Sequence, residues 1–100
     1  MKVDILAIGV HPDDIELCAS GTLLRHLDMG FSIGLCDLTR GELGTRGNGD
    51  LRLKEAEAAR KIFGEDVQRV NLGMADGFFV HNEEHIISIA KVIRQFQPEI

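Results

Sequence analysis

The sequence predicts an α/β fold, in which helices flank an open parallel sheet of Rossmann-like type. Short apolar runs alternate with segments of helical periodicity, and each helical segment is long enough to connect two parallel strands. Polar or glycine-rich segments follow the predicted strands, where ligands bind in sheets of this kind. One hundred residues allow one domain, and we expect residues 1–100 to form it.

The predicted elements run strand, helix, strand, loop, helix, strand, loop and helix. Apolar residues dominate residues 3–10, which predicts a strand covered on both faces. Apolar residues at helical spacing predict a helix over residues 15–29, and Gly30 ends it. The remaining expectations are strands at residues 31–38 and 66–72, and helices at residues 51–63 and from an Asn82 cap to Phe96.

The charge balance argues against nucleic acid as a partner. Eleven Lys and Arg stand against 16 Asp and Glu, for a formal net charge of −5, whereas phosphate binding needs clustered cations. No apolar stretch approaches the roughly 20 residues that span a bilayer, and residues 3–10 are too short for a signal-peptide core. We therefore expect a cytoplasmic protein without a membrane partner. Cys18 and Cys36 lie among apolar neighbours, which predicts two buried thiols.

A polar segment, His11-Pro12-Asp13-Asp14, follows the first predicted strand. An imidazole and a carboxylate held close by a rigid proline can reach one metal ion together. Mixed nitrogen and oxygen ligands suit Zn²⁺. A second carboxylate that does not bind the metal could take a proton from water.

Other interpretations of this loop stay open. Asp13 is a good helix N-cap, and Glu16 three residues later completes a capping box. A dinucleotide fingerprint is disfavoured because Gly9 lacks its companion glycines, and a P-loop because the later glycine-rich loop lacks the required Lys. A receiver domain also places paired acids after its first strand. However, the third predicted strand ends at residues 71–73, without the further Asp that such a domain needs.

Residues 10–16, Val-His-Pro-Asp-Asp-Ile-Glu, are similar to the signature of the PIG-L/LmbE-like zinc-dependent N-deacetylases. These Rossmann-like enzymes remove acetyl groups from N-acetylglucosamine-type sugars. Residues 37–47 (DLTRGELGTRG), Arg52 with the helix that follows it, and residues 71–79, which contain Asp76-Gly77-Phe78-Phe79, resemble one branch of the family. That branch comprises the N-acetylglucosaminyl-malate deacetylases of bacillithiol biosynthesis. The resemblance extends over essentially the whole chain.

The resemblance implies that His11 and Asp14 are zinc ligands and that Asp13 is the general base. Arg52 matches a family position that contacts substrate, where a cation can hold a hydroxyl or carboxylate. The family's third ligand is a His beyond the strand that follows the third helix. On this resemblance, residues 1–100 form the N-terminal half of the family fold, an incomplete domain. His81 and His85 lie before that point, and we expect them to be solvated.

We therefore expect a hydrolase that uses Zn²⁺ to remove the N-acetyl group from a sugar conjugate, with N-acetylglucosaminyl-malate as the specific expectation. The partner is then a small-molecule sugar conjugate, and a homo-oligomer is compatible with the sequence. The alternative is a non-catalytic binding or structural module. Catalytic zinc sites normally have three protein ligands plus water, and the resemblance places two ligands within residues 1–100.

Overall fold

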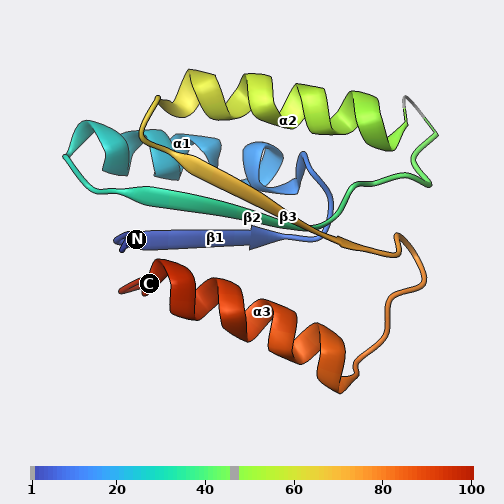
Figure 1. Cartoon of the computed structure of the whole chain (residues 1–100). Coiled ribbons are helices and arrows are strands. Elements are labelled where there is room, and N and C mark those ends of the chain that lie inside the picture. Colours follow the sequence, from blue (N-terminus) through green and yellow to red (C-terminus); the bar gives the residue numbers. More distant parts are fainter. Residues whose placement is uncertain (1, 46–47) are drawn as a thin grey trace.

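Three parallel strands form one sheet in the order β1-β2-β3, and helices cover both of its faces. The computed structural model describes residues 2–45 and 48–100. Its elements are β1 (Ile5–Gly9), α1 (Asp14–Asp28), β2 (Ile33–Thr39), α2 (Gly49–Phe63), β3 (Gln68–Met74) and α3 (Glu83–Phe96). Helices α1 and α2 lie on one face of the sheet, and α3 lies on the other (Figure 1). The predicted α/β fold with a parallel sheet is confirmed.

The central strand β2 is buried along its whole length. Successive side chains of a strand point to opposite faces, so β2 contributes to two apolar cores. Ile33 and Leu35 belong to the core beneath α1 and α2. Cys36 and Leu38 belong to the core on the other face, where Phe96 of α3 is fully buried. Both faces of the sheet are therefore covered at its centre.

The strand that is buried along its whole length is β2, whereas β1, which we expected to be covered on both faces, is covered only in part: Ile5 and Ala7 pack against one core and Leu6 packs against the other. No residue of β1 is fully buried, and Ile8 is 43% exposed. In the sheet β1 pairs with β2, and on its other edge the Leu6 N–H donates to the Ile100 carbonyl at 2.9 Å. The physical reason is this edge position, because an apolar run does not reveal where in a sheet a strand lies.

The helix starts follow their capping side chains. The Asn82 side chain accepts a hydrogen bond from the His85 N–H at 2.9 Å, as predicted for the cap of α3. Asn48 makes the same contact with the Leu51 N–H, also at 2.9 Å. Helix α2 therefore begins at Gly49, two residues before the predicted start.

The two cysteines differ in exposure. Cys36 is buried as predicted, but Cys18 is exposed, so the prediction of two buried thiols is wrong for Cys18. Cys18 lies on α1 beside the open edge of the sheet, where it lines a surface pocket with Ile8 and Val10. None of the described helices combines the length and apolar character needed to cross a bilayer.

Candidate active site

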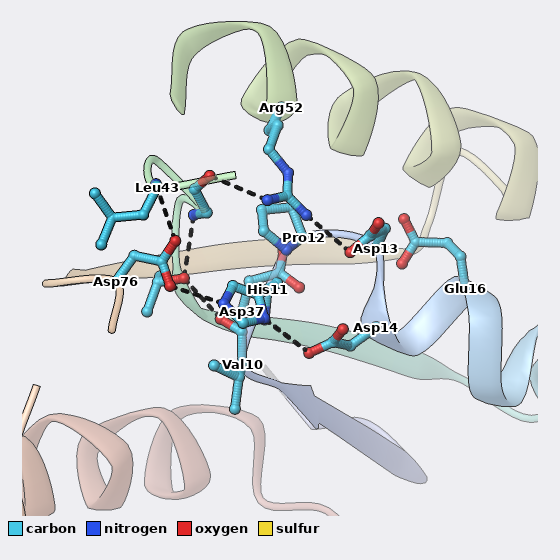
Figure 2. A network of polar contacts seen from close by, with 12 residues as sticks. Val10, His11, Pro12, Asp13, Asp14, Glu16, Asp37, Leu43, Arg52 and Asp76 are labelled. Carbon is cyan, nitrogen blue, oxygen red and sulfur yellow. Dashed lines mark hydrogen bonds and ion pairs between the residues drawn. The ribbon is translucent and has the colours of Figure 1, made fainter. Parts of the chain in front are cut away.

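The predicted site loop connects β1 to α1 at the carboxyl end of the sheet (Figure 2). Its backbone is held by the two neighbouring strands. Thr39, at the end of β2, donates to the Val10 carbonyl through both its N–H and its hydroxyl, each at 2.9 Å. Arg69 of β3 donates to the Pro12 carbonyl. The loop conformation thus depends on residues far away in the sequence.

His11 and Asp14, the predicted metal ligands, lie together in this loop. Asp14 Oδ2 accepts the backbone N–H of His11 at 2.9 Å and lies 3.5 Å from the imidazole Nδ1. The side chains are 37% and 41% exposed, so a cation can approach both from solvent. One imidazole nitrogen and one carboxylate that face each other fit Zn²⁺, which accepts both donor types.

Within the described residues, His11 and Asp14 are the two side chains that lie together as donors for one metal ion. Within residues 2–45 and 48–100, no three His, Cys, Asp or Glu side chains gather into a group that could hold a metal. His81 is exposed, and His85 contacts the Val80 carbonyl through Nδ1 at 2.6 Å. His81 precedes the Asn82 cap of α3, His85 lies in the first turn of that helix, and neither lies in the site loop.

Asp13, the predicted base, and Arg52, the predicted substrate contact, form an ion pair. Arg52 Nη2 donates to Asp13 Oδ1 at 2.9 Å, and Nη1 donates to the Gly41 carbonyl at 3.0 Å. The Asp13 side chain is 56% exposed, whereas that of Arg52 is 17% exposed. The first turn of α2 therefore carries a largely buried, anchored cation, and both side chains line a surface pocket.

The capping box, the competing interpretation of this segment, is wrong. Asp13 occupies the N-cap position of α1, but its side chain makes no cap hydrogen bond. The Asp13 carboxylate contacts Arg52, and the Glu16 carboxylate contacts Arg69 through both oxygens at 3.0 Å. Strong cationic partners brought by α2 and β3 replace the local backbone contacts that the sequence spacing suggests.

Asp76 is a site residue to which the sequence assigned no role. It follows β3, its side chain is 8% exposed, and its Oδ1 lies 2.7 Å from His11 Nε2. Its Oδ2 accepts the Leu43 N–H at 3.0 Å, and its own N–H donates to Glu42 at 3.0 Å. The hydrogen bond with His11 holds the pKa of the Asp76 carboxyl below its ordinary value. Its only sequence signal was its place in the segment that resembles the deacetylases.

A buried ion-pair network lies next to the loop, and sequence reasoning missed it as well. Arg69 donates to Asp37 on β2 and to Glu16 on α1, and its side chain is 5% exposed. Burial disfavours the charged guanidinium, but the bonds with Asp37 and Glu16 outweigh that effect and raise the pKa of Arg69. Burial raises the pKa of Asp37, and Arg69 opposes the shift. The network joins α1, β2 and β3 directly beside the site.

Comparison with known proteins decides the family. Residues 6–100 match the family described as "PIG-L: GlcNAc-PI de-N-acetylase". The chain belongs to the PIG-L family. It is also 44% identical to the uncharacterized deacetylase YaiS of Escherichia coli (strain K12) over 72 residues. This alignment covers 72% of this chain and 38% of YaiS.

Solved structures agree with the assignment to the PIG-L family. The conserved protein TT1542 from Thermus thermophilus matches with a TM-score of 0.86 and 41% identity, over 96% of this chain and 43% of that one. The N,N'-diacetylchitobiose deacetylase from Pyrococcus horikoshii matches with a TM-score of 0.82 and 26% identity. The match covers 92% of this chain and 37% of the deacetylase chain. The predicted correspondence with the N-terminal part of the deacetylase fold is confirmed.

The fold alone does not specify the reaction. GalB, a 4-carboxy-2-hydroxymuconate hydratase from Pseudomonas putida, matches with a TM-score of 0.83 at 24% identity, over 100% of this chain and 45% of that one. Its likeness concerns the fold, because related folds host different chemistries. The chain spans less than half the length of each of these four proteins.

Proposed function

We propose that this chain carries the metal-binding loop of a zinc-dependent N-deacetylase that acts on an N-acetylglucosamine-type sugar conjugate. The observation that carries the proposal is the pair formed by His11 and Asp14, 3.5 Å apart at the carboxyl end of the sheet in a PIG-L family chain. The similarity of residues 37–47 and 71–79 to one branch supports N-acetylglucosaminyl-malate as the substrate, and hence a role in bacillithiol biosynthesis.

His11 and Asp14 would hold the zinc ion, together with a further ligand. When bound, zinc supplies Lewis-acid chemistry, because it polarises an amide carbonyl and eases the deprotonation of water. Asp13 is next to Asp14 in the sequence, and its side chain is 56% exposed. Its carboxylate would take a proton from the attacking water while the water oxygen bonds to the acetyl carbon. The C–N bond then breaks, the amine receives the proton, and acetate leaves.

Arg52 would have two tasks in this scheme. Its guanidinium holds Asp13 Oδ1 at 2.9 Å and so orients the base. Because Arg52 has several N–H donors and lines a surface pocket with Asp13, it can also donate to a hydroxyl or carboxylate of the sugar conjugate. Small-molecule recognition at this pocket requires no nucleic-acid or membrane partner.

The test uses the natural protein. We expect bound zinc by elemental analysis and acetate release from N-acetylglucosaminyl-malate. His11→Gln and Asp14→Asn should lose zinc, whereas Asp13→Asn should retain zinc and lose at least about 100-fold in activity. His26→Gln is the matched control, because His26 lies on α1 and contacts the Thr22 carbonyl. Zinc-free protein without deacetylase activity on this or related N-acetyl sugars would contradict the proposal.

One observation favours the alternative of a non-catalytic binding module. The described residues do not gather a third donor beside His11 and Asp14, and two protein ligands seldom hold zinc firmly. The same purified protein distinguishes the two functions. Stoichiometric zinc with amide hydrolysis supports the enzyme, whereas weak zinc binding with no hydrolysis supports the module.

A further inference from the structure

The two ring nitrogens of His11 face two different carboxylates. Nε2 lies 2.7 Å from Asp76 Oδ1, and Nδ1 lies 3.5 Å from Asp14 Oδ2. The sides differ in solvent access, because the Asp76 side chain is 8% exposed and the Asp14 side chain is 41% exposed. A cation from solvent therefore reaches the Nδ1 side of the ring, and the Nε2 side is closed (Figure 2).

Asp76 cannot join Asp14 as a ligand of the same ion while this ring orientation is kept. The lone pairs of the two imidazole nitrogens point away from each other, so one ion binds one nitrogen. Both Asp76 oxygens are also engaged, Oδ1 with His11 and Oδ2 with the Leu43 N–H at 3.0 Å. Asp76 is thus a hydrogen-bond partner of His11 and not a further metal ligand.

An ionised carboxylate accepts hydrogen bonds and donates none, so the proton between Asp76 and His11 belongs to Nε2. A neutral imidazole that carries its proton on Nε2 keeps the lone pair on Nδ1. Without Asp76, the nearby Asp14 carboxylate would attract that proton to Nδ1 and block the metal-facing position. The two carboxylates therefore compete for one proton, and the short contact with Asp76 decides the competition.

We propose that Asp76 is the positioning residue of His11: its carboxylate holds Nε2–H and reserves Nδ1 for a metal ion shared with Asp14. The metal half of this inference rests on the proposed function. Hydrogen-bond partners of this kind orient metal-binding histidines, and their loss commonly lowers metal affinity by about 10- to 100-fold.

Asp76→Asn is an isosteric test. The Leu43 N–H requires an oxygen acceptor, so the Asn oxygen takes that place and its NH₂ group faces His11 Nε2. Nε2 must then accept, and the proton moves to Nδ1. Glu42→Gln is the matched control, because its amide oxygen can still accept the Asp76 N–H and Glu42 has no hydrogen bond with His11 in the described structure.

The experiment records long-range ¹H–¹⁵N spectra of histidine in the metal-free natural protein, with His11 assigned through His11→Gln, and measures Zn²⁺ affinity by chelator competition. We expect Nε2–H in the wild type and in Glu42→Gln, Nδ1–H in Asp76→Asn, and at least about 10-fold weaker zinc binding by Asp76→Asn alone. An unchanged His11 tautomer in Asp76→Asn, or zinc affinity within about twofold of the wild type, would overturn the inference.

The two measurements separate this inference from the proposed function. If the wild type binds no zinc, the proposed function and the metal half of the inference fail together, and the spectra of the metal-free protein still decide whether Asp76 sets the tautomer. If the wild type binds zinc and Asp76→Asn changes neither readout, the inference about Asp76 fails and the function stands.

Discussion

Arg69 on β3 holds Asp37 on β2 through two hydrogen bonds, of 2.6 Å from Nε and 2.9 Å from Nη2. Both side chains are nearly inaccessible to solvent, at 5% and 2% exposure. Arg69 also donates to Glu16 and to the Pro12 carbonyl in the site loop. A cation in the sheet therefore connects the packing of two strands to the backbone that carries the candidate metal ligands.

We predict that Arg69→Met lowers the free energy of unfolding by about 3 kcal/mol or more, because it leaves the Asp37 carboxylate buried without its partner. Urea denaturation measures the change. Lys2→Met is the control, since Lys2 pairs with Glu99 at the surface, where the two side chains are 63% and 67% exposed, and such pairs contribute at most about 1 kcal/mol. Equal losses for the two variants would contradict the prediction.

We expect a side chain at Gly41 to be costly for two reasons, the backbone conformation and the position of Arg52. The φ of Gly41 is +64°, and a Cβ there would overlap the guanidinium of Arg52. Gly41→Ala should therefore push Arg52 away from Asp13. It should lower the free energy of unfolding by more than the roughly 1 kcal/mol expected from backbone strain alone. Gly30→Ala is the matched control, because Gly30 has φ +91° with open space around it.

A double-mutant cycle tests the cause of the Gly41→Ala effect. If the overlap with Arg52 is responsible, Gly41→Ala should cost clearly less in an Arg52→Ala background, with a coupling of about 1 kcal/mol or more. The free energies of unfolding of the four proteins give this coupling. Additive effects would show that Arg52 is not the source of the cost.

The sequence singles out His11, Asp13 and Asp14 as candidates without tertiary information, because these residues are contiguous and follow an apolar strand. Asp76 and Arg69 escaped prediction, since His11 and Asp76 lie 65 residues apart in the sequence and Asp37 and Arg69 lie 32 apart. Which charges meet depends on how the strands pair and where the loops end, and neither is encoded in local spacing.

The sequence did not predict the exposure of β1 and Cys18, because that exposure depends on which strand lies at the edge of the sheet. Residues 3–10 and β2 are both apolar runs, but β2 has a strand on each side and β1 lies at the edge. The error for Cys18 has the same origin, because Cys18 lies beside Ile8 at the uncovered edge. Apolar flanking residues in the sequence do not by themselves bury a side chain. Burial also requires another element of the fold to pack over that position.

The difference between the two cysteines predicts selective thiol reactivity. Cys18 is exposed and Cys36 is 1% exposed, and a thiol must be both accessible and ionised to react. With a disulfide reagent near neutral pH, Cys18→Ser should lower the number of fast-reacting thiols by one, whereas Cys36→Ala should leave that number unchanged. Fast reaction of Cys36 in the folded protein would contradict the structure.

Burial raises the pKa of the Cys36 thiol to about 11, from an ordinary value of 9.0, and the charge of Asp37 adds to the shift. As the pH rises, the Cys36 thiol therefore loses its proton at a lower pH in the unfolded chain than in the folded chain. The contribution of this thiol to the free energy of unfolding is fully present below about pH 9. It falls as the pH rises toward about 11, by at most about 3 kcal/mol. The free energy of unfolding should fall more steeply across this window in the wild type than in Cys36→Ala. Parallel profiles would contradict the prediction.

Phe96 belongs to the apolar core between α3 and the sheet. It is fully buried, and Gly34 of β2 leaves space for its ring, because a Cβ at Gly34 would lie 3.0 Å from two ring atoms. Phe96→Ala should lower the free energy of unfolding by about 3–5 kcal/mol. Ile93→Ala on the same helix is the control, since Ile93 is 44% exposed and should cost clearly less.

Gly34 gives the complementary test of this contact. Gly34→Ala should destabilise the wild type, because the new methyl group presses on the Phe96 ring, and the penalty should shrink in a Phe96→Leu background, where the ring is absent. Denaturation of the two single variants and the double variant measures the coupling. If Gly34→Ala costs the same in both backgrounds, the ring of Phe96 is not what requires glycine at this position of β2.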